Sequence, residues 1–511
     1  MTHRRGIVLV LVLVVISLLT LAGLTLSELM LAERRAAQLT GQQAQARALA
    51  ESGVEMARHF LDSDPDTQNQ AGGWYNNAQQ FCANVVLDGE TAKDRGRFTI
   101  LAPQVDDLTY TQIRYGLSDE SARLNLATVL ALDKKTPGTG EQILMNLPGM
   151  TQDIADALLD WMDSSQTPRA NGAKAEYYGT LSPPYQPRND IPTTIEEFLL
   201  VRDVTPQLLF GLDTNRNGLL DPDEPGSDTL QGIDNSDGSM NCGWAAYLTL
   251  YSAESTLQSD GTPKINLNSS DLQKLHDDLS QALDPPSADF ICAYRLVGNG
   301  GTIQGEMDLT QQGSNQFTTV LDLVGAKISR QAAAVASGPG NRGGPPPPPV
   351  PIPCPFPNDP ASMGTYLTKL QDKTTTASAA TIPGRININQ APQTVLQCIP
   401  NLTSDAIQQI LALRTPDPTQ ADPGRKYATW LLSEGLVSLA TMKQLMPLVT
   451  GGGSVYRAQV VGYYEEGRPF ARLEAVIDAT QRPARIVFWK DLTRLGSGYP
   501  LEVLGGSPAG Q

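Results

Sequence analysis

The sequence has few of the residues that metal-dependent and nucleophilic enzymes need. Its 511 residues include only three histidines and five cysteines, without a CxxC pair, so a zinc site is not expected. The GxSxG, HExxH and P-loop motifs are absent too, and His59 and His276 each stand alone. We therefore do not expect an enzyme. The widely spaced cysteines would allow one or two disulfides in an oxidising compartment, but their spacing does not indicate which ones pair.

Positive charge is also scarce. The net charge of −16 disfavours binding to nucleic-acid phosphates and agrees with a solvated, exported protein. Apolar residues make up 40% of the chain, which at this length is enough for two or three packed domains.

The longest apolar run covers residues 6–26 and contains no charge. As a helix, these 21 residues are about 30 Å long, the thickness of the hydrocarbon core of a bilayer. Arg4 and Arg5 precede the run, so its start should face the cytoplasm and the chain after Glu28 should be exported. A cleavable secretory signal fits less well, because the run exceeds the usual core of about 7–15 residues and lacks a small-residue cleavage site.

A helix is expected to continue from this run to Leu61. The segment is rich in Ala, Leu, Gln, Glu and Arg and contains no proline before Pro65. Small apolar residues recur along it at steps of three and four, which predicts one narrow apolar face. From Ile7 to Leu61 the rod would be about 80 Å long.

A basic leader that ends in glycine, an apolar helix and an amphipathic continuation together resemble the type IV pilins and pseudopilins. The resemblance implies that a prepilin peptidase cuts between Gly6 and Ile7 and that the new N-terminus is methylated. Most such subunits carry Glu at mature position five, where this chain has Leu11. Lack of this Glu is typical of the minor pseudopilin K family of type II secretion, which is proposed to cap the tip of the fibre.

Three copies of one short motif, here called the repeated word, divide the exported chain. They are RLNLA at 123–127, KINLN at 264–268 and RININ at 385–389. Each word opens an expected helical hairpin, at 142–163, 271–297 and 394–414. The repeated Asn125, Asn266 and Asn387 are expected to cap helices or bridge backbone groups.

These hairpins resemble helix-hairpin-helix units, which in other proteins grip DNA phosphates. The first copy has a single glycine, Gly149, followed by acidic residues, and the third copy has Asn401 in place of glycine. We therefore expect a packing scaffold or a protein-docking surface and no nucleic-acid binding.

The twelve residues 213–224, DTNRNGLLDPDE, fill every position of a calcium-binding loop. The expected ligands are Asp213, Asn215, Asn217, the Leu219 carbonyl, Asp221 and Glu224. Gly218 would allow the sharp turn. The alternative is an acidic surface loop of Asx turns. Pro222 and the lack of a clear exiting helix favour a single loop over a paired EF-hand.

A second acidic cluster follows, formed by Asp228, Asp234, Asp237 and Asn241. A solvated loop is favoured there, with a second calcium ion as the open alternative.

The expected fold class is α+β: a long membrane-spanning helix, a small antiparallel sheet built from both chain ends, and inserted helical units of helix-hairpin-helix or SAM-like type. Strands are expected at 97–101, 108–115, 455–464, 470–479 and 484–489, and a short helix at 77–87. The expected divisions are a leader (1–6), the pilin-like helix (7–62), the first part of the α+β domain (63–118), helical unit 1 with the calcium loop (119–263), helical unit 2 (264–337), a proline-rich linker (338–384), helical unit 3 (385–450) and C-terminal strands that complete the α+β domain (451–511).

The order of motifs along the chain, with DESARLNLA at 119–127, LLDWMD at 158–163 and VFWKDL at 487–492, resembles the pseudopilin K family over nearly the full length. The resemblance implies a minor pseudopilin at the tip of a periplasmic pseudopilus, anchored by one span in the inner membrane. It would initiate assembly with other minor pseudopilins and support protein export. One alternative is a minor pilin of a type IV pilus or competence fibre, and neighbouring secretion genes would distinguish a pseudopilin from it. The other is a membrane-tethered calcium-dependent binding module, which would not be cleaved after Gly6.

Overall fold

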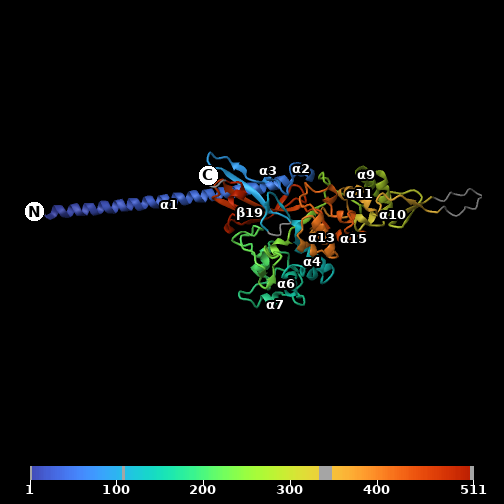
Figure 1. Ribbon diagram of the computed structural model, residues 1–511, viewed down its shortest axis with the longest axis horizontal. Helices are drawn as coiled ribbons and strands as arrows, with labels where there is room; N and C mark the ends of the chain where they lie inside the picture. Colours follow the sequence, from blue (N-terminus) through green and yellow to red (C-terminus); the bar gives the residue numbers. More distant parts are fainter. Residues whose placement is uncertain (1–2, 106–109, 333–347, 507–511) are drawn as a thin grey trace, which may run out of the picture.

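The computed structural model describes residues 3–105, 110–332 and 348–506. Its longest element is helix α1 (His3–Leu61), which confirms the predicted rod. Residues from Ile7 to Leu31 are exposed on all sides. This apolar half, with a mean hydropathy of 3.1 over its most apolar 18 residues, is long and apolar enough to cross a membrane. It extends away from the rest of the protein, whereas the C-terminal half of α1 lies against the folded region (Figure 1).

The C-terminal half of α1 packs on a seven-stranded antiparallel sheet built from both chain ends, as predicted. The main path of this sheet is β1 (Asn84–Leu87), β2 (Gly96–Pro103), β18 (Val455–Tyr464), β19 (Phe470–Asp478) and β20 (Arg485–Asp491). Two short strands, β3 (Ile113–Arg114) and β4 (Ser118–Asp119), pair with β2 and β18. Ala46, Ala50 and Val54 of α1 are buried against the sheet. At Gly462 a Cβ would collide with the backbone of α1, so the small face of the rod permits a close crossing.

Each repeated word forms a two-residue strand, and each pairs in parallel with a second short strand that closes the helical unit. The pairs are β5 (Leu124–Asn125) with β8 (Leu248–Thr249), β10 (Ile265–Asn266) with β14 (Thr374–Thr375), and β16 (Ile386–Asn387) with β17 (Val449–Thr450). These pairs enclose unit 1 (124–249), unit 2 (265–375) and unit 3 (386–450). The three closing strands all end in threonine.

The predicted hairpins are present in all three units. They are α5 (Thr139–Leu144) and α6 (Gln152–Met162) in unit 1, α9 (Leu272–Ala282) and α10 (Pro285–Val297) in unit 2, and α12 (Gln393–Gln397) and α13 (Ser404–Leu413) in unit 3. Helix α4 (Leu126–Lys135), which was not predicted, precedes the hairpin of unit 1. Asn125 caps α4 as expected, because its side chain accepts from the N–H groups of Ala127 and Thr128. Asn266 and Asn387 have the other expected role and bond to local backbone groups, the N–H groups of Asn268 and Asn389.

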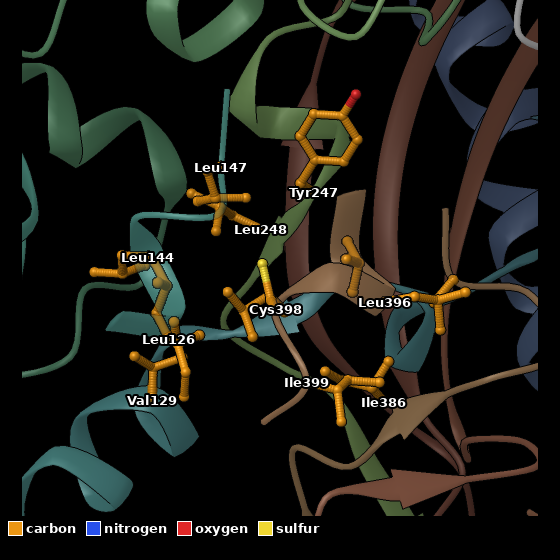
Figure 2. Close-up of a cluster of buried hydrophobic side chains, with 14 of the residues drawn as sticks. Leu126, Val129, Leu144, Leu147, Tyr247, Leu248, Ile386, Leu396, Cys398 and Ile399 are labelled. Atoms are coloured by element: carbon orange, nitrogen blue, oxygen red, sulfur yellow. The ribbon is translucent and has the colours of Figure 1, made fainter. Parts of the chain in front are cut away.

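Units 1 and 3 share one hydrophobic core. Leu126, Val129, Leu144 and Leu147 of unit 1 lie near Ile386, Leu396, Cys398 and Ile399 of unit 3, with Tyr247 and Leu248 beside them (Figure 2). Unit 2 has a core of its own around α9 and α10. It is inserted through a neck of two antiparallel strands, β9 (Ala253–Ser255) and β15 (Thr381–Pro383), and it forms the end of the molecule opposite the start of α1 (Figure 1).

Several expectations differ from the structure. The strand expected at 108–115 is limited to β3, and residues 106–109 lie outside the described residues. Helix α3 ends at Phe81, because Ala83 has a positive φ of 54°, and the second half of the helix predicted at 77–87 is strand β1. Within 338–384, where we expected a linker, lies helix α11 (Pro360–Lys373), whose Leu367 and Leu370 are buried; residues 338–347 lie outside the described residues. All five cysteines are in the described part of the chain, and each is a free thiol.

Candidate calcium site

The predicted calcium loop follows a short helix of unit 1, α8 (Pro206–Phe210). The Thr205 hydroxyl caps this helix by accepting from the Leu208 N–H at 3.2 Å. The chain then turns at Gly211, and the Asn241 carbonyl accepts from the N–H groups of Leu212 at 2.8 Å and Asp213 at 3.3 Å. These two bonds fix the backbone at Asp213, the first ligand position.

The loop curls around the side chain of Asp213. Its two carboxylate oxygens accept from the N–H groups of Asn217 at 3.1 Å and Gly218 at 2.9 Å. The Asn217 side-chain oxygen accepts in turn from the Leu219 N–H at 2.8 Å. Gly218 has φ +77°, in agreement with its expected role in the turn.

Glu224 closes the loop from its other end. Its Oε1 accepts from the N–H groups of Thr214 at 2.7 Å and Asn215 at 3.2 Å, and its Oε2 accepts from the Asp221 N–H at 3.3 Å. The side-chain amides of Asn215 and Asn217 both donate to Asp221 Oδ2, at 2.5 Å and 3.0 Å. The structure therefore brings all the predicted side-chain ligands into one small loop.

The electrostatics of the loop favour a cation. Asp213 and Glu224 are 7% and 6% exposed, and neither forms an ion pair with a described residue. Burial raises the pKa of Asp213 to about 6, and the charge of Glu224 adds to this rise. The charge of the buried Arg472 acts on Asp213, but its side chain bonds to the Asn215 carbonyl and to neither carboxylate. Two buried carboxylates without an ion-pair partner are unfavourable, and a hard cation that prefers oxygen ligands would reduce this cost.

The donor set fits calcium better than it fits zinc. Among the described residues, no group of three or more His, Cys, Asp or Glu side chains is placed to hold a metal ion. A cation in this loop would therefore depend on amide and carbonyl oxygens as well as on carboxylates. Calcium accepts such mixed oxygen shells.

The second predicted cluster is more open. Asp228, Asp234 and Asp237 are exposed, and Asp234 and Asp237 each accept from a backbone N–H two residues ahead, on Ser236 and Ser239. Hydrogen bonds from Ser236 hold the pKa of Asp234 below its usual value. Asn241 is buried and accepts from the Asn235 side chain at 2.9 Å. The structure does not gather these four side chains around one point.

Sequence reasoning missed the residues on which the loop rests. Leu219 is buried on the sheet face opposite α1, among Leu101, Val461, Tyr463, Tyr499 and Leu504. Arg472 of β19 donates to the Asn215 carbonyl, and Gly498 accepts from the Asn217 amide at 2.6 Å. These contacts join positions more than 250 residues apart. The only local sign is a charged residue, Arg472, within an apolar strand.

Residues 122–213 match the family model described as "Type II secretion system (T2SS), protein K". The match confirms the resemblance drawn from the sequence for this region, which holds the first repeated word and α4 to α6. It ends at Asp213, so the rest of the calcium loop lies outside it.

No curated protein matches the chain at a significant level. Among solved structures, a chain in the crystal structure of the GspK-GspI-GspJ complex from the enterotoxigenic Escherichia coli Type 2 Secretion System is similar. The sequence identity is 12%, the TM-score is 0.35, and the similarity covers 90% of this chain and 99% of that chain. A TM-score of this size carries no argument about fold or function.

The predicted processing site, Gly6 and Ile7, lies in the first turns of α1, at the start of its apolar part. The helix places this site at the end of the rod farthest from the sheet (Figure 1). The helical units therefore do not cover it.

Proposed function

We propose that this chain is a minor pseudopilin that joins the tip of a periplasmic type II secretion pseudopilus, initiates its assembly and supports protein export. The observation that carries the proposal is the protein K match at 122–213, in a unit attached to a sheet on which a single long helix packs. The other half of that helix is apolar and exposed, as a membrane anchor requires. The role is structural, without catalysis.

The same proposal gives the topology and the processing. The apolar half of α1 spans the inner membrane once, and the sheet and the helical units lie in the periplasm. A prepilin peptidase removes residues 1–6, and Ile7 becomes the methylated N-terminus. The exported part of the rod, Glu28 to Leu61, then packs beside the rods of other minor pseudopilins. Its exposed Leu29, Leu31 and Leu39 are suited to such contacts.

Calcium is part of the proposal. Asp213, Asn215, Asn217, the Leu219 carbonyl, Asp221 and Glu224 would hold one ion, and the ion would supply positive charge between two buried carboxylates. The burial of Asp213 and Glu224 without an ion pair to a described residue supports this assignment. At Asp228, Asp234, Asp237 and Asn241 the separated, exposed side chains favour a solvated loop over a second ion.

Processing and copy number test the proposed function. We expect mass spectrometry to find Ile7 at the mature N-terminus, and Gly6→Val to retain the leader. Gly23→Val is the matched control, because a Cβ at Gly23 meets nothing within 4 Å and the residue lies within the same apolar helix. Quantitative crosslinking from the exported rod should find other minor pseudopilins and a low copy number. An intact leader in the wild-type protein would exclude any pilin-like function, whereas a copy number near that of the major subunit would exclude the tip.

A further inference from the structure

The calcium loop of unit 1 lies against the face of the sheet opposite α1, with Asp213, Asn217, Leu219 and Glu224 buried. The chain's C-terminal segment, residues 496–505, contacts it there. The Asn217 side chain donates to the Gly498 carbonyl at 2.6 Å, and the Tyr499 hydroxyl lies 3.3 Å from the Asn217 carbonyl. A single proposed ligand therefore touches the C-terminal segment through both its side chain and its backbone.

The sheet contributes a second set of contacts. The Tyr499 hydroxyl donates to Gln459 of β18 at 2.8 Å, and the Gln459 side chain donates to the Arg216 carbonyl in the loop at 3.1 Å. Two adjacent positions of the loop, Arg216 and Asn217, are thus tied to one strand and to the C-terminal segment.

Arg472 of β19 lies between these parts. Its side chain is fully buried, and it donates from Nη2 to the carbonyl of Asn215, a third loop position. Its Nε and Nη1 have no hydrogen-bond partner among the described residues. Gly498 has φ +74°, and a Cβ there would collide with Nη1 of Arg472. The guanidinium therefore needs the glycine in order to reach the loop.

We propose that the loop is a calcium-dependent latch that holds unit 1 and the C-terminal segment on the sheet, with Arg472 as its positioning residue. The inference rests on the calcium site of the proposed function. An ion that fixes Asn215 and Asn217 also fixes the groups to which Arg472, Gly498 and Tyr499 bind. Opening of the latch releases the ion. Calcium therefore lowers the population of the open state by the factor 1 + [Ca]/Kd, which is about a hundredfold when the calcium concentration is a hundred times Kd.

Hydrogen exchange of the full-length protein in detergent tests the latch. With calcium in place of chelator, amides at 496–505 should exchange at least about tenfold more slowly, and those of α10 in unit 2 should not change. Calorimetry with calcium chloride is run on the same sample. If calcium binds in a 1:1 ratio and exchange at 496–505 stays the same, the latch is wrong and the site stands. If calcium does not bind, both proposals fail.

Two glycine variants separate the latch from backbone strain. Gly498→Ala and Gly496→Ala place alanine at φ +74° and +91°, but at Gly496 the nearest heavy atom to the new Cβ is 4.0 Å away. By reciprocal coupling, Gly498→Ala should weaken calcium binding at least about fivefold and speed exchange at 496–505, relative to Gly496→Ala. Tyr499→Phe keeps the buried ring and should show a smaller loss. Equal calcium affinity in the two glycine variants would overturn the latch.

Discussion

A buried cluster of charges joins the sheet to unit 1. Glu120 is fully buried and forms an ion pair with Arg457 of β18 at 2.6 Å, while Arg123 lies 3.2 Å from the same carboxylate. Arg457 also pairs with Glu474 of β19 at 2.7 Å. Burial alone would raise the pKa of Glu120, but the two arginines outweigh it and lower the pKa to about 2. This cluster fixes the start of the first helical unit to two strands.

Replacement of Glu120 by Gln should destabilise the protein by about 3 kcal/mol, because Arg457 and Arg123 stay buried with less compensating charge. The pKa of Glu120 is lower in the folded protein than in the unfolded chain, where it is near 4.5. Ionised Glu120 therefore stabilises the folded state fully above pH 4.5, and this stabilisation is lost as the pH falls toward about 2. The urea midpoint of the wild-type protein should therefore fall over this range more than that of Glu120→Gln. Lys274→Ala, which removes an exposed pair with Asp278, is the control and should leave the midpoint unchanged. Equal midpoints for wild type and Glu120→Gln at pH 7 would contradict the prediction.

Glu224→Gln should remove most of the stabilisation by calcium. At a hundred times Kd, calcium adds about 2.7 kcal/mol to the wild-type protein, because only the folded loop presents all the ligands. Differential scanning fluorimetry should show a higher Tm with calcium than with chelator, and little difference in the variant. Asp228→Asn, in the exposed second cluster, is the matched control and should keep the wild-type difference. A wild-type Tm that is the same with calcium and chelator would argue against the metal.

At the scale of elements, the repeat places the same short strand in three different environments. Asn387 of β16 is buried and donates to Asp119 of β4 at 2.8 Å, so the word of unit 3 is bonded to the sheet. Burial raises the pKa of Asp119, and the bonds from Asn387, Gly453 and Ser121 oppose this rise. Asn266 of β10 is only half-buried and accepts from the Asn268 N–H at 2.9 Å. The repeated asparagine thus stabilises a local turn in unit 2 and links the unit to the sheet in unit 3.

Asn387→Ala should therefore lower the free energy of unfolding more than Asn266→Ala does. The first change removes a donor from a buried carboxylate, which costs about 1–3 kcal/mol, and the second removes a half-exposed local hydrogen bond worth about 1 kcal/mol. Chemical unfolding of the two variants measures the difference. If both alanine variants lost the same stability, the bond from Asn387 to Asp119 would add nothing beyond a local hydrogen bond.

Elements with local signals could be predicted from the sequence. Helix α1 follows from its composition and its small apolar face, and β18 and β19 follow from alternation and β-branched residues. The closing strands β8, β14 and β17 could not be predicted, because two residues carry no periodicity and their partners lie more than 60 residues away. Arg472 was missed for the same reason, since its contacts are set by packing and not by spacing.

At the scale of the whole molecule, the apolar half of the rod extends from one end, and the sheet and the helical units form the rest (Figure 1). The apolar half of α1 has no contact that buries it, and the units form a mass much wider than the rod. A subunit of this shape fits the end of a fibre better than its interior, because the wide part would obstruct a subunit stacked above it.

Leu11 allows the position in the fibre to be tested by a single substitution. It is 62% exposed in the apolar part of α1. With the proposed cleavage after Gly6 it would be the fifth residue, where most pilin-like subunits carry Glu. A carboxylate there is favourable only when the amine of a neighbouring subunit is beside it, and without that partner it costs about 2.5 kcal/mol in lipid. If this chain is at the tip, Leu11→Glu should lower the amount of protein in the membrane and the export of substrates, whereas the uncharged control Leu11→Ala should keep both near wild type. Immunoblots of membrane fractions and secretion assays measure these two quantities. A Leu11→Glu protein that accumulates and supports secretion as well as the alanine variant, with new crosslinks to major subunits on both sides of its rod, would show that a partner amine is present and that the chain is internal.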